Sequence, residues 1–121
     1  MSDQRPKVFI VEDETALAIV LEDMVIDSGC DPVLTVGNIR DAELAFERLI
    51  CDCALIDINV GGEKSFGIAQ KLIERGTPFA FLTGYDASLV SEFRTVPVLQ
   101  KPYTQTQVQK VLAGLMNEAK S

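Results

Sequence analysis

Short apolar runs alternate with amphipathic segments along the chain. Two of these runs, Val8-Phe9-Ile10-Val11 and Cys53-Ala54-Leu55-Ile56, are apolar throughout and stop at acidic residues, which is typical of strands buried on both faces. Three further strands are predicted over 32–36, 78–82 and 96–99. Apolar residues at helical spacing predict helices over 15–28, 38–49, 66–76 and 104–119, and a short helix is expected to begin near Asp86. The pattern therefore predicts five strands that alternate with five helices.

The same pattern predicts how the helices begin, end and face the core. Thr15, Asn38 and Thr104 have side chains suited to capping a helix N-terminus, and Gly29 and Gly76 follow two of the helices. The residues expected to face inward are Leu17, Val20, Leu21, Met24 and Val25; Ala42, Ala45, Phe46 and Leu49; Phe66, Ala69, Leu72 and Ile73; and Val108, Val111, Leu112, Leu115 and Met116.

Alternating strands and helices predict a parallel sheet that is covered by helices on both faces. Proline cannot donate a hydrogen bond to a neighbouring strand, so the strands containing Pro32 and Pro97 are expected at the edges. The two most apolar strands belong in the middle. The strand order 2-1-3-4-5 meets these conditions, and it predicts an α/β protein with a flavodoxin-like (βα)5 doubly wound sheet.

Composition narrows the possible functions. The 121 residues suffice for a single domain, 1–121, with no output domain. A net charge of −7 argues against binding to nucleic acid or to an anionic membrane, and no apolar run reaches the ~20 residues of a membrane span. The absence of histidine excludes Ser-His-Asp and Cys-His catalysis. Three cysteines without an export signal predict reduced thiols and a cytoplasmic location.

Polar residues stand at the predicted carboxyl ends of four strands. They are Glu12, Asp13 and Glu14 after the first strand, Asp57 and Asn59 after the third, Thr83 at the end of the fourth, and Lys101 after the fifth. Each has an ordinary structural explanation when taken alone, such as a helix N-terminus, a turn or a solvated lysine. Because all of them fall at one edge of the sheet, we expect them to line a single crevice.

The chemistry of this set indicates a metal and a phosphoryl group. Two carboxylates about 5 Å apart repel each other by about 3 kcal/mol at an effective dielectric constant near 20, so either a raised pKa or a bound cation is expected. Oxygen ligands favour Mg²⁺ over Zn²⁺. A carboxylate beside Mg²⁺ suits phosphoryl transfer, with Asp57 as the nucleophile. Lys101 and Thr83 are placed to bind the remaining phosphoryl oxygens.

Together these motifs resemble those of the receiver domains of two-component response regulators. The matching elements are Val11-Glu12-Asp13-Glu14, Leu55-Ile56-Asp57, Thr83-Gly84 and Lys101-Pro102, and the similarity extends from Val8 to about Met116. The resemblance implies that Asp57 accepts a phosphoryl group from a phosphohistidine on a sensor histidine kinase or a histidine phosphotransfer protein. It also implies that Mg²⁺ is held by Glu12, Asp13, Asp57 and the backbone carbonyl of Asn59.

The resemblance further implies a switch. Thr83 would be the switch hydroxyl, and Lys101 would bind the phosphoryl group and precede a cis Pro102. Phosphorylation would change the binding of a downstream protein through the face of the fourth helix, the fifth strand and the fifth helix, or the chain would act as a phosphoryl relay or sink. Such a protein is not an enzyme beyond its own phosphorylation and dephosphorylation, and it is expected to be a monomer or a weak homodimer.

The sequence departs from the family pattern in two places. Val98 stands where many members have an aromatic switch residue, so Tyr85 or Tyr103 would have to replace it. The loop after Asp57 has Val60-Gly61-Gly62-Glu63-Lys64 where a proline is usual, which looks like a single-domain subgroup of the family. Asn59 and Tyr85 flank the acyl phosphate in this family, and we expect Tyr85 to slow the approach of water.

Two other classes of function remain open. A phosphatase or other metal hydrolase would need a second acid, and none stands out. A phosphorylation-independent interaction module of the same fold would not depend on Mg²⁺, and its partner binding would survive an Asp57→Asn substitution. Gly62-Glu63-Lys64-Ser65 lacks the spacing of a Walker phosphate-binding loop and is expected to be a turn into the third helix.

Overall fold

The structure, a computed structural model, describes residues 4–84, 93 and 95–120. Its elements are β1 (Lys7–Val11), α1 (Thr15–Asp27), β2 (Asp31–Val36), α2 (Ile39–Phe46), β3 (Cys53–Asp57), β4 (Asn59–Val60), β5 (Glu63–Lys64), α3 (Phe66–Arg75), β6 (Phe79–Thr83), β7 (Val98–Gln100) and α4 (Gln105–Lys120). The short helix expected near Asp86 lies outside the described residues.

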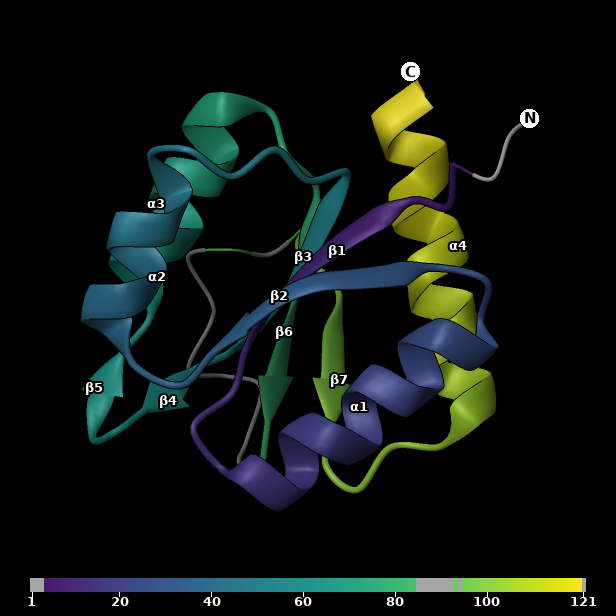
Figure 1. Cartoon of the computed structure of the whole chain (residues 1–121), viewed down its shortest axis with the longest axis horizontal. Helices are drawn as coiled ribbons and strands as arrows, with labels where there is room; N and C mark the ends of the chain where they lie inside the picture. Colours follow the sequence, from purple (N-terminus) through teal and green to yellow (C-terminus); the bar gives the residue numbers. More distant parts are fainter. Residues whose placement is uncertain (1–3, 85–92, 94, 121) are drawn as a thin grey trace.

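The central sheet has five parallel strands in the order β2-β1-β3-β6-β7 (Figure 1). This order confirms the predicted 2-1-3-4-5 arrangement, because β4 and β5 form a separate two-stranded hairpin. Pro32 lies in the edge strand β2, as expected. Pro97 was expected inside the other edge strand, but it precedes β7, and its carbonyl accepts a hydrogen bond from the backbone N–H of Phe81.

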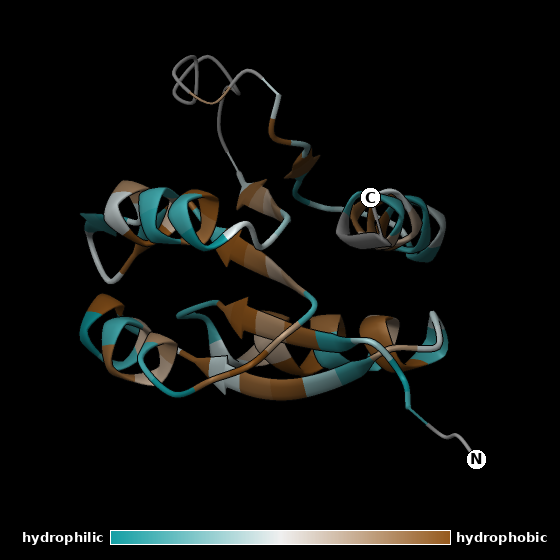
Figure 2. Cartoon of the chain, turned by 90° about the horizontal axis from the view of Figure 1, so that it is seen from above, coloured by the Kyte–Doolittle hydropathy of each residue, from teal (hydrophilic) through white to brown (hydrophobic). Residues whose placement is uncertain are grey.

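Two hydrophobic cores lie on opposite faces of the sheet. α2 and α3 cover one face and α1 and α4 cover the other, and Figure 2 shows the hydrophobic strands between them. The core beneath α2 and α3 includes Phe9, Phe46, Ile56, Ile68, Leu72 and Phe81. The core beneath α1 and α4 includes Ile10, Leu21, Val25, Leu55, Leu82 and Leu112. Alternate residues of each central strand enter opposite cores, which explains why these strands are apolar throughout.

The helix caps agree with the predictions at two of three positions. The Asn38 side chain accepts a hydrogen bond from the backbone N–H of Asp41, and the Thr104 hydroxyl accepts one from the backbone N–H of Gln107. Thr15, however, is the first residue of α1, and the capping position belongs to Glu14, whose side chain makes no capping bond. A threonine and a preceding acid are both suited to a helix N-terminus, so sequence alone does not separate the two positions.

The predicted inward faces are wrong at Val20 and Ile73, which are both 47% exposed. Ala18 and Ile68 are buried in the same helices instead. In α1 the cause is its composition, because apolar residues occur on all sides of the helix and the direction of the core is ambiguous.

The cysteines belong to the core, and all three are free thiols. Cys30 and Cys53 are buried, and burial raises the pKa of Cys51 to about 11. Such thiols stay protonated at neutral pH and are poor nucleophiles. Among the described residues, no helix has the length and apolar character needed to cross a membrane.

Candidate functional site

The site lies at the carboxyl ends of four adjacent parallel strands. Asp57 is the last residue of β3, Thr83 is the last residue of β6, Glu12 follows β1 and Lys101 follows β7. The register pairs Asp57 with Leu82 of β6, so the ends of β3 and β6 lie level with each other. The predicted crevice therefore forms because the strands are parallel, and Figure 1 shows the arrowheads of β6 and β7 at the same end of the sheet.

The ammonium of Lys101 joins two carboxylates from two other strand ends. Its Nζ lies 2.7 Å from Oδ2 of Asp57, to which it donates a hydrogen bond, and 3.0 Å from Oε1 of Glu12 in an ion pair. The backbone supports this placement, because the Lys101 N–H donates to the carbonyl of Thr83 at 2.7 Å. The Lys101-Pro102 peptide bond is cis, as the resemblance implied.

The combined effect of burial and neighbouring charges raises the pKa values of Lys101 and Glu12. Burial by itself would lower the pKa of Lys101, but its contacts with Asp57 and Glu12 outweigh burial and raise that pKa above its ordinary value. Lys101 therefore stays protonated throughout the physiological range. Burial is also the main reason why the pKa of Glu12 is raised, although Lys101 opposes this shift. One ammonium thus incompletely compensates the carboxylates around it.

Glu12, Asp13 and Asp57 each have a carboxylate oxygen within 4.8 Å of the other two, which is close enough to share one cation. The Glu12 side chain is buried, and within the described part of the chain the contact of its Oε1 is the ion pair with Lys101. Lys101 is shared between Glu12 and Asp57, so the three acids together carry more negative charge than this ammonium compensates, and a further cation is favoured. Because the donors are all oxygen, the set fits Mg²⁺.

The site opens onto a cavity of about 350 Å³ lined by Asp13, Glu14, Asp57, Asn59, Gly84 and Lys101. Asp57 is only 5% exposed and lines this cavity, so a ligand reaches its carboxylate from the cavity. Thr83 is buried at the end of β6 beside this opening, with 1% of its surface exposed. All six residues expected from the sequence, Glu12, Asp13, Asp57, Asn59, Thr83 and Lys101, lie at this edge of the sheet. Tyr85 lies outside the described residues.

A hairpin that the sequence did not reveal closes one side of the cavity. β4 and β5 form an antiparallel pair, and the backbone N–H of Gly61 in their turn donates to Oδ2 of Asp13 at 2.9 Å. The buried Ser65 hydroxyl donates to the carbonyl of Asp57 at 2.6 Å. Neither contact has a sequence signature, because glycine and serine are ordinary turn residues. The turn of the hairpin therefore holds Asp13 through a backbone N–H, and the residue that follows the hairpin holds the Asp57 carbonyl through a side-chain hydroxyl.

Tyr103 packs against the core beneath α1 and α4, and its buried hydroxyl has no hydrogen-bond partner among the described residues. Burial, followed by the nearby Glu12 carboxylate, raises the pKa of Tyr103 to about 12. The folded protein therefore binds this proton more tightly than the unfolded chain does. The corresponding stability is complete below about pH 10 and is lost as the pH rises towards about 12.

We expect Tyr103→Phe to reduce this alkaline loss of stability. From about pH 9 to 11 the wild type should lose about 1 kcal/mol more free energy of unfolding than the variant, after allowance for partial exposure. At pH 7 the variant should be at least as stable as the wild type, because it removes a buried hydroxyl that bonds to none of the described residues. Urea unfolding across this pH range measures both effects, and parallel curves for the two proteins would contradict the first.

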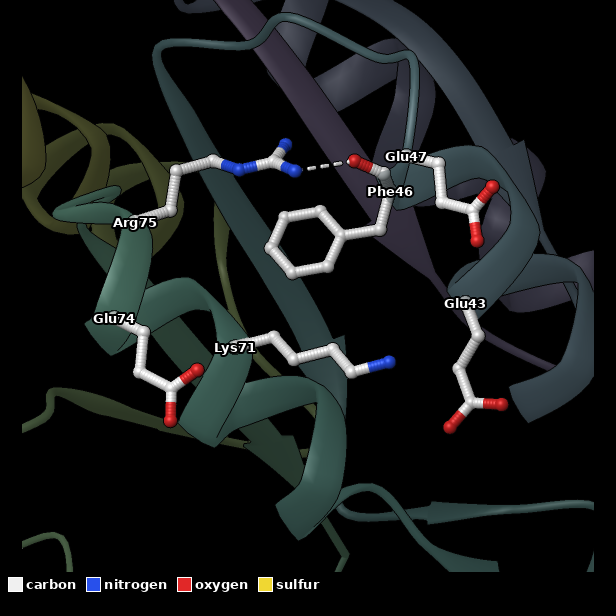
Figure 3. A pocket seen from close by; sticks show the side chains of 6 residues that line it. All are labelled: Glu43, Phe46, Glu47, Lys71, Glu74 and Arg75. Carbon is white, nitrogen blue, oxygen red and sulfur yellow. Dashed lines mark hydrogen bonds between the residues drawn. The ribbon is translucent and has the colours of Figure 1, made fainter.

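A second cavity, of about 410 Å³, lies between α2 and α3 (Figure 3). In it the Arg75 guanidinium lies 3.9 Å from the centre of the Phe46 ring and donates hydrogen bonds to the carbonyls of Phe46 and Leu49. The Phe46 carbonyl belongs to the last residue of α2, where carbonyls lack helical partners, and Leu49 lies in the segment that follows. Arg75 therefore links α3 to the end of α2, with one N–H of each terminal guanidinium nitrogen bonded to a carbonyl.

Comparison with solved structures supports the family resemblance. SdrG from Sphingomonas melonis Fr1 is 43% identical, over 96% of this chain and 99% of SdrG, with a TM-score of 0.83. A BeF3-activated conformation of SdrG from Pseudomonas melonis Fr1 is 41% identical, over 95% of this chain and 99% of that chain, with a TM-score of 0.79. The REC domain of the Erythrobacter litoralis PhyR response regulator shares the fold at 24% identity, over 93% and 91% of the two chains, with a TM-score of 0.82. No protein-family model and no curated protein matches the chain.

Proposed function

The chain belongs to the receiver-domain family of response regulators, and on that premise we propose that it is switched by transfer of a phosphoryl group to Asp57. The observation that carries the proposal is the junction of Lys101 with Asp57 and Glu12, 2.7 and 3.0 Å away. The donor is a phosphohistidine of a sensor histidine kinase or a histidine phosphotransfer protein. A receiver domain has a phosphorylation-switched signalling role in general, and the roles of the individual residues below are part of our proposal.

The transfer forms one bond and breaks another. A carboxylate oxygen of Asp57 attacks phosphorus while the bond between phosphorus and the histidine nitrogen breaks, and that nitrogen keeps the electron pair. Lys101 then binds the phosphoryl oxygens, because its ammonium already lies at Oδ2 of Asp57. Thr83, at the end of the next strand, supplies the switch hydroxyl. The product is an acyl phosphate on Asp57.

Glu12, Asp13, Asp57 and the backbone carbonyl of Asn59 would hold Mg²⁺. When bound, the ion neutralises charge on the phosphoryl oxygens. The peptides before the Asn59 carbonyl are held in place, because Ser65 bonds to the carbonyl of Asp57 and the Ile58 N–H donates to Leu82. The hairpin contact with Asp13 orients a second acid of the set.

Phosphorylation adds a group of about −2 charge to a site with a single ammonium among its described residues. We propose that this charge moves Thr83 and changes the surface formed by β7, α4 and the segment before β7. Most of that segment, residues 85–92 and 94, lies outside the described residues. That surface binds or releases a protein partner, or the chain passes the phosphoryl group on as a relay or sink. We also propose that it has no enzymatic activity beyond its own phosphorylation and dephosphorylation, and that it acts in the cytoplasm as a monomer or weak homodimer.

The proposal is tested by incubation with acetyl phosphate and Mg²⁺, followed by intact mass measurement. We expect a gain of one phosphoryl group that a chelator prevents. A phosphorylation-independent interaction module would gain no mass, and a phosphatase would release phosphate from small esters in many turnovers. Either result would overturn the proposal.

An Asp13→Asn substitution should raise the free energy of unfolding in the absence of Mg²⁺ and lower it relative to the wild type when Mg²⁺ is bound. Asp13 is an exposed acid within 4.8 Å of two others, so without Mg²⁺ its neutralisation should stabilise the chain by about 1 kcal/mol after solvent screening. At a Mg²⁺ concentration of about 100 times its Kd, the wild type should gain about 2.7 kcal/mol, and the variant should lose most of this gain.

Urea unfolding of the wild type and the variant, with and without Mg²⁺, measures this change in which protein is more stable. Asp23→Asn makes the same change at an exposed position of α1 and should leave the response to Mg²⁺ unchanged. Equal stabilisation of wild type and Asp13→Asn by Mg²⁺ would remove Asp13 from the metal site.

A further inference from the structure

The β4–β5 hairpin places a lysine beside a residue of the cavity. Asn59 and Lys64 are directly opposite each other in this antiparallel pair, so their side chains lie on the same face. Gly61 and Gly62 form the two-residue turn, and both have positive φ, of 59° and 84°. This is the type of turn that joins strands by two residues and sets their register. Val60 is buried on the hairpin's other side, which fixes the hairpin to the core beneath α2 and α3.

The contact between the two side chains has a defined polarity. Nζ of Lys64 lies 2.7 Å from Oδ1 of Asn59 and donates a hydrogen bond to it. An ammonium has donors only, so it is the carboxamide oxygen of Asn59 that faces Lys64. The other end of the carboxamide is an NH₂ group, which only donates. Asn59 lines the same cavity as Asp57, so its bond to Lys64 engages an acceptor that a water in this cavity would otherwise use.

Hydrolysis of an acyl phosphate on Asp57 is assisted by a hydrogen-bond acceptor near the attacking water and hindered by a donor. A water oxygen bonds to phosphorus, the bond from phosphorus to the Asp57 oxygen breaks with its electron pair going to the carboxylate, and the water protons end on inorganic phosphate. A nearby acceptor assists by holding the water through one of its protons, as a carboxamide oxygen does in some nucleotide hydrolases. An NH₂ group instead binds the lone pair that the water needs for attack.

We propose that Lys64 is a positioning residue that keeps the Asn59 carboxamide oxygen away from the hydrolytic water and thereby prolongs the phosphorylated state. This inference rests on the proposed function of Asp57. A purely electrostatic role of Lys64 has the opposite sign, because a nearby cation eases attack on an anionic phosphoryl group. The sign of the effect therefore distinguishes the two roles.

The test compares the lifetime of the acyl phosphate in four variants with that in the wild type. Each protein is phosphorylated with acetyl phosphate and Mg²⁺, freed of the donor, and followed by intact mass. Lys64→Met should lose the phosphoryl group about threefold to tenfold faster than the wild type, which corresponds to one net hydrogen bond. Lys71→Met removes the same charge from an exposed position of α3 and should leave the lifetime unchanged.

Variants of Asn59 test whether Lys64 acts through it. The lifetimes of Asn59→Ala and of Asn59→Ala combined with Lys64→Met should agree within about twofold. In the unphosphorylated protein, the NMR signals of the Asn59 side-chain NH₂ should shift in Lys64→Met and not in Lys71→Met. The urea midpoints of all variants show whether the fold is retained.

Three results would overturn the inference about Lys64. An unchanged or longer lifetime in Lys64→Met excludes the positioning role. Faster hydrolysis that persists in the Asn59→Ala background shows that Lys64 does not act through Asn59, and an unchanged Asn59 NH₂ signal shows that the contact is absent in solution. A wild type that gains no phosphoryl group contradicts the function proposed for Asp57 itself, so the two failures are distinguishable.

Discussion

Asp57→Asn is expected to gain no phosphoryl group from acetyl phosphate and Mg²⁺ under conditions that phosphorylate the wild type. The carboxamide has no anionic oxygen to attack phosphorus. Its oxygen still accepts the hydrogen bond from Lys101, which is 2.7 Å long in the wild type, and the residue retains nearly the same volume. The free energy of unfolding should therefore stay within about 1 kcal/mol of the wild-type value, so that the loss reflects chemistry and not folding.

Intact mass measurement follows the gain of the phosphoryl group, and urea unfolding checks the fold. Asp23→Asn, on the exposed side of α1, is the matched control and should be phosphorylated like the wild type. Phosphorylation of Asp57→Asn to the wild-type extent would assign the acceptor to another residue. If the wild type bound its partner equally before and after phosphorylation, the proposed switch would be contradicted, whereas the role of Asp57 as the acceptor would stand.

Lys101→Met should slow phosphorylation by about 10²- to 10³-fold, which is typical when one preorganised donor to a developing anion is removed. Lys101 contacts both Asp57 and Glu12, so its loss also leaves these carboxylates without their ammonium. Mg²⁺ binding should become tighter in this variant, because a cation that repels the ion has been removed. A slower reaction together with tighter metal binding would separate the role of Lys101 from that of the metal.

The rate comes from the time course of mass gain at saturating Mg²⁺, and the affinity comes from a Mg²⁺ titration of stability. Lys110→Met, on the exposed surface of α4, removes the same charge and should change neither quantity. A rate for Lys101→Met within about threefold of the wild type would show that its ammonium does not stabilise the transfer.

The strands were predictable because burial on both faces leaves an unbroken apolar run. β1 and β3 contribute alternate residues to opposite cores, so every position from Val8 to Val11 and from Cys53 to Ile56 is apolar. β4 and β5 were not predictable, because strands of two residues are too short for any periodicity. They depend on the turn and on contacts with distant residues. The inward face of α1 was ambiguous for the opposite reason, since it has apolar residues on every side.

The candidate site divides in the same way. Its acids, its hydroxyl and its lysine were recognisable because they stand at successive strand ends, where a parallel sheet brings them to one edge. Their partners were not recognisable. Ser65 bonds to the carbonyl of Asp57, and Gly61 bonds to Asp13, 48 residues away in the sequence. Each bond has a backbone atom on one side, which every residue has, so the sequence does not show which segments it joins.

The sequence by itself determined the order of elements, the parallel sheet and the set of groups at its carboxyl edge, because hydrophobic periodicity and residue position are local properties of the chain. Only the tertiary structure decided that Lys101 pairs with both Asp57 and Glu12 and that a short hairpin turns the Asn59 oxygen towards Lys64. Those features depend on distances and directions between segments far apart in the chain, and these exist only once the two cores have formed.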